Sequence, residues 1–217
     1  MEPVENLGRE RILERIRAAL REPAPRHAGV PGKAIFAPVE DPLDRFQKEC
    51  TANVTECTVT PDLRASGRAI AGALAELPPG GIFVQDTPEL RRLSVDWQYD
   101  RNIQWSSEGA PQESAQATIT TAEALVALTG SVLVSAACGG RGASVVAPVH
   151  IVLATSEQLV PDLEAAFTYI RQRELPLKNS YLCLITGSSR TADIEKILVM
   201  GAHGPRRLIV VLSMKPS

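Results

Sequence analysis

The stretch HIVLATSEQLVPDLEAAFTYIRQRELPLKNSYLCLI, residues 150–185, alternates short apolar runs with one helical segment. His150–Ala154 and Tyr181–Ile185 are apolar runs of strand length, and Val160–Arg173 between them has the composition of a helix. This alternation is typical of α/β proteins, in which a largely parallel sheet carries helices on its faces. The stretch therefore predicts an α/β fold.

The same rhythm continues on both sides of this stretch. Strands are expected at residues 54–60, 81–85, 103–106, 118–121 and 208–212, and helices at residues 44–53, 61–77 and 192–200. Leu125–Leu128 and Ser131–Ser135 are separated only by Thr129 and Gly130, which predicts a tight hairpin. We expect an open, mostly parallel sheet with an antiparallel hairpin part.

Three segments are expected along the 217 residues. Residues 1–21 form a charged helix with one apolar stripe, made of Leu7, Ile12, Leu13, Ile16 and Leu20. Residues 22–42 are a connector rich in proline and glycine, and residues 43–217 form the α/β domain. The apolar stripe packs either on the chain's own body or on a partner subunit, and the sequence leaves both open.

Charge and cysteine content exclude several classes of protein. The 23 basic and 25 acidic residues nearly cancel, so no nucleic acid partner is expected. Charged residues interrupt the N-terminus and no apolar run approaches the roughly 20 residues of a membrane span, so we expect a cytoplasmic protein without a transmembrane segment. The four cysteines form no C-x-x-C pair, so this chain is expected to bind no metal or cofactor itself.

Loops that leave strands are the expected place for a ligand in such a fold. The loop TGSSRTAD, Thr186–Asp193, precedes an expected helix and combines a glycine, hydroxyls and Arg190, a composition suited to a carboxylate or phosphate. A capped helix start is the alternative, since Asp193 can satisfy the same helix end. The loop SAACGGRGAS, Ser135–Ser144, surrounds Arg141 with glycines that let backbone amides approach a ligand.

These loops supply a set of candidate ligand-binding residues. They are Gly140, Arg141, Gly142, Gly187, Ser188, Ser189, Arg190, Thr191 and His203. His150 lies within an expected strand, where a structural role is usual, and Cys138 has no base beside it in the sequence. The G-x-G-x-x-G fingerprint is incomplete because Val145 occupies its last position, and there is no P-loop, G-x-S-x-G or H-E-x-x-H motif.

Two long motifs resemble a known family. The stretch ITGSSRTADIEKILVMGAHGPRRLIVVL, Ile185–Leu212, and the stretch LTGSVLVSAACGGRGASVVAPVHIV, Leu128–Val152, are similar to the LUD-domain family, in particular to its lactate-utilisation C members. The likeness runs from about Cys50 to Leu212. It implies the NagB/RpiA/CoA-transferase-like fold, and a cluster-free accessory role beside iron–sulfur partner proteins that oxidise L-lactate.

One position departs from the family pattern. Family members commonly carry an acidic residue before the T-G of the hairpin, whereas this chain has Leu128. Leucine has no nucleophilic atom, so covalent CoA transfer through this position is excluded. Glu123 or Glu113 could substitute for that acidic residue, but nothing in the sequence favours either one.

The leading hypothesis is thus a non-redox subunit of a lactate-oxidising iron–sulfur system that holds a small carboxylate or phosphate between Arg141 and Arg190. The alternatives are an independent enzyme acting on a small phosphorylated or acyl substrate, and a ligand sensor. The sequence leaves open whether the chain is catalytic.

Overall fold

The computed structural model of this chain describes residues 5–22, 35–97, 102–109, 114–192, 198–200 and 204–215. The chain divides into two compact units, Met1–Ile35 and Phe36–Ser217. The first unit contains helix α1 (Glu5–Ala19), and the side chains of Ile12, Ile16 and Leu20 are exposed. Packing of this stripe on the chain's own body and packing on a partner subunit both stay predictions.

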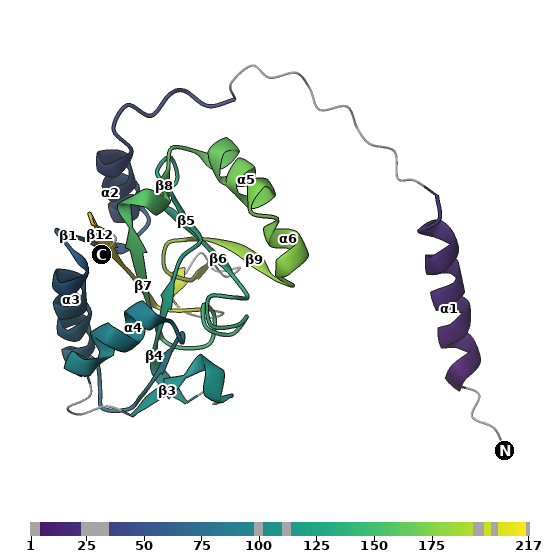
Figure 1. Ribbon diagram of the computed structural model, residues 1–217, viewed down its shortest axis with the longest axis horizontal. Coiled ribbons are helices and arrows are strands. Elements are labelled where there is room, and N and C mark those ends of the chain that lie inside the picture. The colour runs from purple at the N-terminus through teal and green to yellow at the C-terminus, as the bar shows by residue number, and fades with distance from the viewer. Residues whose placement is uncertain are drawn as a thin grey trace. The chain divides into compact units, whose positions relative to one another are not determined.

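The second unit is built on a large sheet in which every described pairing is parallel (Figure 1). Its strand order is β1-β12-β7-β4-β2-β3. The strands are β1 (Glu56–Thr60), β2 (Gly81–Val84), β3 (Ile103–Trp105), β4 (Ala115–Thr121), β7 (Val149–Thr155) and β12 (Arg207–Ser213). The expectation of an open, mostly parallel sheet is confirmed.

A smaller mixed sheet lies beside the large one, in the order β8-β5-β6-β9. Its strands are β5 (Ala124–Val126), β6 (Ser131–Ser135), β8 (Leu159–Val160) and β9 (Leu182–Thr186). The predicted antiparallel hairpin is present as β5 and β6, but Val126 pairs with Ser131, so its loop has four residues, 127–130, rather than two. Strand β9 was expected from the sequence, and it joins this smaller sheet by antiparallel pairing with β6.

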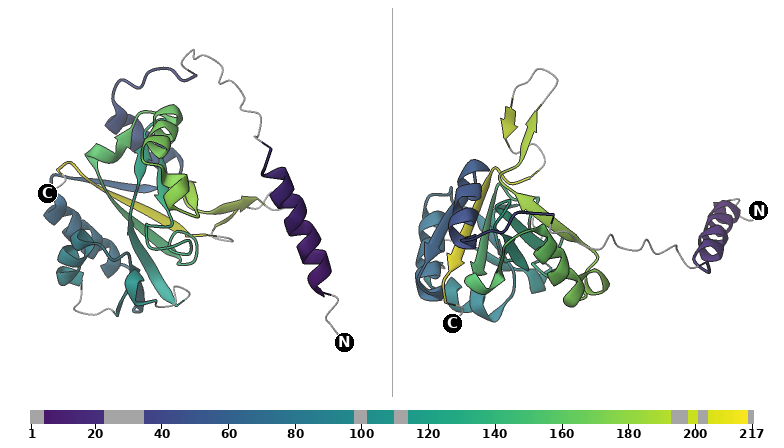
Figure 2. Two further views of the ribbon diagram at one scale, coloured as in Figure 1. Left: turned by 45° about the vertical axis from the view of Figure 1, so that its right-hand side comes forward. Right: turned by 90° about the horizontal axis from the view of Figure 1, so that it is seen from above.

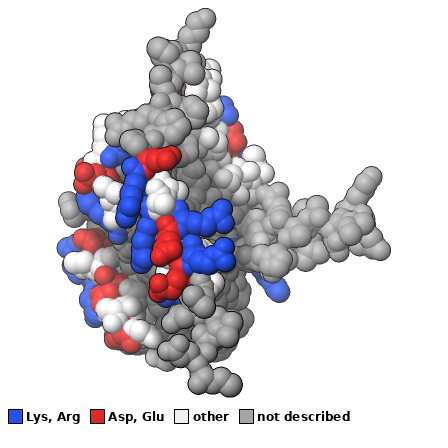
Figure 3. Space-filling view, turned by 90° about the vertical axis from the view of Figure 1, so that its right-hand side faces the viewer, with Lys and Arg blue, Asp and Glu red and all other residues white. Residues whose placement is uncertain are grey.

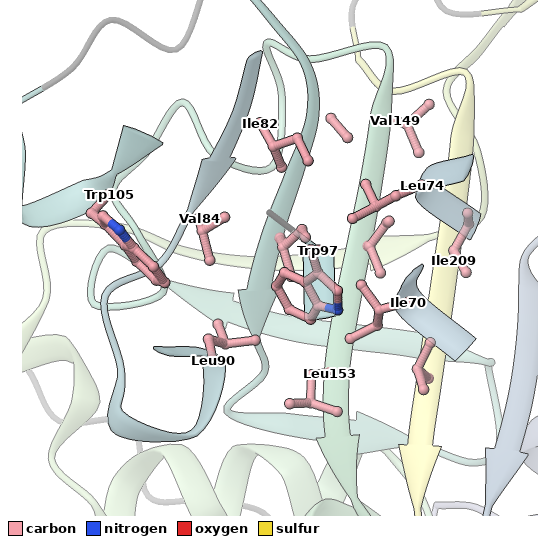
Figure 4. Close-up of a cluster of buried hydrophobic side chains, with 14 residues drawn as sticks. Ile70, Leu74, Ile82, Val84, Leu90, Trp97, Trp105, Val149, Leu153 and Ile209 are labelled. Carbon is pink, nitrogen blue, oxygen red and sulfur yellow. The ribbon is translucent and has the colours of Figure 1, made fainter. Parts of the chain in front are cut away.

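Helices on one face of the large sheet cover a hydrophobic core. They are α3 (Leu63–Ala75), α4 (Pro88–Leu93) and the short 3-10 helix η1 (Ser94–Trp97). Side chains of alternate strand residues, such as Val149 and Leu153 of β7, point to this face and belong to one buried cluster with Ile70 and Trp97 (Figure 4). Burial of these side chains holds α3 and α4 against the sheet.

The opposite face of the large sheet packs against the smaller sheet. Val152, Val210 and Leu212 of the large sheet meet Val132 and Val134 of the smaller one, and helix α2 (Pro42–Ala52) joins the same core. The far side of the smaller sheet is covered by α5 (Leu163–Gln172) and α6 (Leu175–Lys178). The layers therefore run from α3 and α4 through the two sheets to α5 and α6 (Figures 1 and 2).

One expected helix is absent from the described residues. Residues 192–200 were expected to be helical, whereas Arg190–Ala192 forms β10 and Leu198–Met200 forms β11. The two strands pair antiparallel, with Thr191 opposite Val199. The prediction was wrong for residues 192 and 198–200, because short apolar runs do not distinguish helix from strand by periodicity alone, and residues 193–197 lie outside the described residues.

The face drawn in Figure 3 carries lysine and arginine side chains interleaved with aspartate and glutamate. This agrees with the near balance of 23 basic and 25 acidic residues.

Candidate functional site

The loop after β9, which holds three of the candidate ligand-binding residues, is packed tightly against the corner between α2 and β1. Gly187 has φ +78°, and a Cβ placed on it would lie 2.3 Å from the backbone oxygen of Asn53. The buried hydroxyl of Ser188 donates to the backbone oxygen of Val54 at 2.9 Å, and the backbone amide of Ser189 donates to the oxygen of Pro205 at 2.9 Å. Gly187 and Ser188 are thus engaged in holding the fold together.

The Thr-Gly pair of the β5–β6 hairpin docks on the same corner. A Cβ on Gly130 would lie 2.8 Å from the backbone carbon of Glu49, and the side-chain amide of Asn53 donates to the oxygen of Thr129 at 3.0 Å. Hydroxyl contacts link Ser131 to Thr129 at 2.7 Å and to Thr186 at 2.6 Å. Close backbone approach therefore accounts for Gly130 and Gly187, one glycine in each of the two motifs that carry the family resemblance.

The loop after β6 packs against the large sheet and leaves Arg141 exposed. Ala143 and Ala147 of this loop are buried against Phe83 and Ala115, and the backbone oxygen of Ala143 accepts from the Thr118 hydroxyl at 2.5 Å. The Arg141 guanidinium lies 3.5 Å from the backbone oxygen of Ser180 and has no carboxylate partner among the described residues. Its predicted role in anion binding stays a prediction.

The two glycine loops leave opposite ends of the smaller sheet. In the antiparallel pairing of β6 and β9, Ser131 faces Thr186 and Ser135 faces Leu182. The loop with Arg141 follows Ser135, so it leaves the end where β9 begins, and the loop with Gly187 starts about four strand residues, or roughly 13 Å, away. Neighbouring strands of a parallel sheet end at one common edge, whereas β6 and β9 run antiparallel and end at opposite edges.

The three candidates that remain are Arg190, Thr191 and His203. Arg190 and Thr191 lie on β10 rather than at a helix start, so the helix end expected to attract an anion there is missing. Their side chains and all of His203 lie outside the described residues.

His150 is fully buried on β7, on the side of the large sheet that faces the smaller one. Its Nε2 atom and the Thr120 hydroxyl lie 2.9 Å apart, while Nδ1 has no partner among the described residues. Burial lowers the pKa of His150 to about 4, so the ring is neutral near pH 7. The expected structural role fits this position, although the partner is a threonine side chain rather than the backbone.

A cavity of about 490 Å³ opens at the carboxyl ends of β4 and β7, the edge where parallel sheets bind ligands. We call it the carboxyl-edge cavity. Thr121 and Thr155, the last residues of the two strands, line it together with Glu157, Tyr169 and Arg173. Arg173 lies over the Tyr169 ring, with 5.4 Å between the guanidinium carbon and the ring centre. The general preference of ligands for the carboxyl ends of strands predicts this edge of the sheet, but no local sequence pattern singles out Tyr169 or Arg173.

Glu123, the residue that the sequence could not favour over Glu113, lies next to this cavity. Its carboxylate accepts from the buried Ser135 hydroxyl at 2.6 Å, and with burial it raises the pKa of Tyr169, which lines the cavity. The Ser135 hydroxyl also lies 3.9 Å from the Cys138 sulfur. Glu113 lies outside the described residues.

Cys138 is poorly suited to act as a nucleophile. Its side chain is 4% exposed, and burial together with the nearby Glu123 charge raises the pKa of its thiol. A thiol with a raised pKa stays protonated near pH 7, whereas nucleophilic chemistry requires the thiolate.

Comparisons with known proteins agree with this fold. The family model described as the LUD domain matches residues 109–213. A Bacillus subtilis protein named lactate utilization protein C is 25% identical over 95% of this chain and 91% of its own length, and its Bacillus velezensis counterpart is 28% identical over 96% and 91%. The crystal structure of a DUF162 family protein from Deinococcus radiodurans superposes with a TM-score of 0.61 at 20% identity, covering 79% of this chain and 96% of that one. Residues 109–213 thus match the LUD-domain family, and the chain as a whole is similar to proteins named lactate utilization protein C.

The described residues contain neither a helix that could span a membrane nor a metal-binding group of side chains. None of their helices is long and apolar enough to cross a membrane. They also contain no group of three or more histidine, cysteine, aspartate or glutamate side chains placed to hold a metal ion.

Proposed function

We propose that this chain takes part in lactate utilisation, as a cluster-free subunit that works beside iron–sulfur proteins. The observation that carries the proposal is the similarity to proteins named lactate utilization protein C, which extends over 91% of their length. A match over nearly the whole of both chains, rather than over one motif, supports a shared cellular role.

The positions of the cysteines support the cluster-free part of the proposal. Cys50, Cys57 and Cys183 belong to the core between the two sheets, and Cys138 is buried at the end of β6. All four contribute to packing between layers of the fold, so electron transfer in this proposal is assigned to the partner proteins.

Growth on lactate tests the proposed role. Deleting the gene for this chain in its native cell should prevent growth on L-lactate and leave growth on glucose unchanged, and a plasmid copy should restore it. Normal growth of the deletion strain on L-lactate would refute the role.

Affinity purification tests the partner assignment. A tagged copy of the full chain, purified from cells grown on lactate, should bring down proteins with cysteine-rich cluster motifs together with stoichiometric iron and acid-labile sulfide. The tagged chain could instead purify alone at micromolar concentration while the strain still grows on lactate. This result would refute the partner assignment and leave the role in lactate utilisation standing.

A further inference from the structure

A second cavity, of about 620 Å³, lies between α3 and α4 and is rich in arginine. Arg64 and Arg68 of α3 and Arg92 of α4 line it, and Glu89 is the one acidic residue among the described residues of its lining. We call it the arginine groove. Its volume falls within the range of about 300–1,000 Å³ that is typical of small-molecule sites.

Close packing of the two helices builds the groove. Leu93 of α4 lies against Gly67 of α3, where a Cβ would be only 3.0 Å from a Leu93 methyl carbon, and the Trp97 indole donates to the Gly67 oxygen at 3.1 Å. These contacts bring the start of α3 and the body of α4 side by side, on the face of the sheet shown in Figure 4.

The three arginines of the groove have little local compensation. Arg64 and Arg68 are one helical turn apart, an arrangement of like charges that destabilises a helix, and neither makes an ion pair with a described residue. Arg92 has only Glu89, at 3.9 Å. By contrast, Arg207 is paired at short distance with two carboxylates, Glu56 and Glu76.

We propose that the arginine groove is a binding site for a phosphate-bearing small molecule. Guanidinium groups match phosphate oxygens in two-point geometry, and three of them around one cavity suit a group with about two negative charges better than a single carboxylate. The groove shares Leu63 and Glu89 with the carboxyl-edge cavity, so the rest of the ligand extends toward Thr121 and Tyr169. This site is separate from the proposed role in lactate utilisation and does not depend on it.

Titration calorimetry of the full chain with inorganic pyrophosphate, at constant ionic strength, tests the proposal. The double variant Arg64→Gln/Arg68→Gln should weaken binding by about tenfold or more, because each arginine provides charge-assisted hydrogen bonds. Arg68→Lys, which keeps the charge but loses the two-point geometry, should lie between the double variant and the wild type.

The matched control is Arg171→Gln on α5. It removes one positive charge, half of what the double variant removes, from an exposed arginine whose guanidinium donates to Thr168 of its own helix, and it should bind pyrophosphate like the wild type. Unchanged binding in the double variant would overturn the proposal, as would equal losses in the double variant and the control. L-lactate binding as tightly as pyrophosphate, and weakened by the same variants, would overturn the assignment to phosphate.

Discussion

Substitution Gly187→Ala tests whether the loop after β9 is a structural clamp. The new Cβ would lie 2.3 Å from the Asn53 oxygen, and φ at this position is +78°. The left-handed conformation costs an L-residue about 1–2 kcal/mol, and the overlap with a backbone atom adds about 1–3 kcal/mol as the α2–β1 corner shifts. We expect the free energy of unfolding to fall by about 2–5 kcal/mol.

Urea denaturation followed by the fluorescence of Trp97 and Trp105 measures this change, and Gly72→Ala is the matched control. Gly72 lies inside α3 with no atom within 4 Å of its added Cβ, so the same substitution there should stabilise the chain by about 0.5–1 kcal/mol. If the free energy of unfolding of Gly187→Ala stays within about 1 kcal/mol of the wild type, the contact between this loop and Asn53 does not hold the fold together.

Three further predictions concern buried and paired side chains. Because burial lowers the pKa of His150 to about 4 from 6.5, only the unfolded chain takes up a proton between these pH values, so the free energy of unfolding should fall by about 3 kcal/mol from pH 6.5 to pH 4. Urea denaturation across this pH range measures the change. His150→Asn should make the free energy of unfolding depend less on pH there, and an unchanged slope would show that His150 does not cause the dependence. A hydrogen bond with Cys50 lowers the pKa of Cys57, so iodoacetamide should label Cys57 before the buried Cys138, and mass spectrometry showing the reverse order would contradict this. Arg207→Gln should lower the free energy of unfolding by about 1 kcal/mol or less in low salt and by less in roughly 1 M salt, since the ion pairs it removes are partly exposed; a salt-independent loss would argue for a packing role instead.

The sequence predicted the elements that have a strong local pattern. The apolar run of β12 and the alanine-rich helix α3 were placed within about two residues of their observed bounds, because burial on both faces of a strand and capping by Asp62 leave clear signals. Residues 192 and 198–200 were misassigned because periodicity alone does not distinguish helix from strand in a short apolar run such as Ile197–Met200, while the pairing of β10 with β11 depends on a partner strand rather than on local composition.

The candidate site was harder to predict because it depends on pairing and packing between distant segments. Strand β6 pairs antiparallel with β9, about 50 residues later, and this direction separates two loops that local patterns placed together. The arginines of α3 and α4 are ordinary surface residues in the sequence, and only the packing at Gly67 brings them to one cavity. The sequence could predict that a cavity opens at the carboxyl ends of the parallel strands, but it could not predict which side chains from other segments line it.

Hydrogen exchange of the full chain with and without inorganic pyrophosphate measures directly where a phosphate group binds. If the glycine loops build the scaffold and the arginine groove holds the ligand, exchange should slow in residues 63–70 and 88–95 and stay unchanged in residues 139–142 and 186–189. Protection of the glycine loops, with none on α3 and α4, would contradict the account.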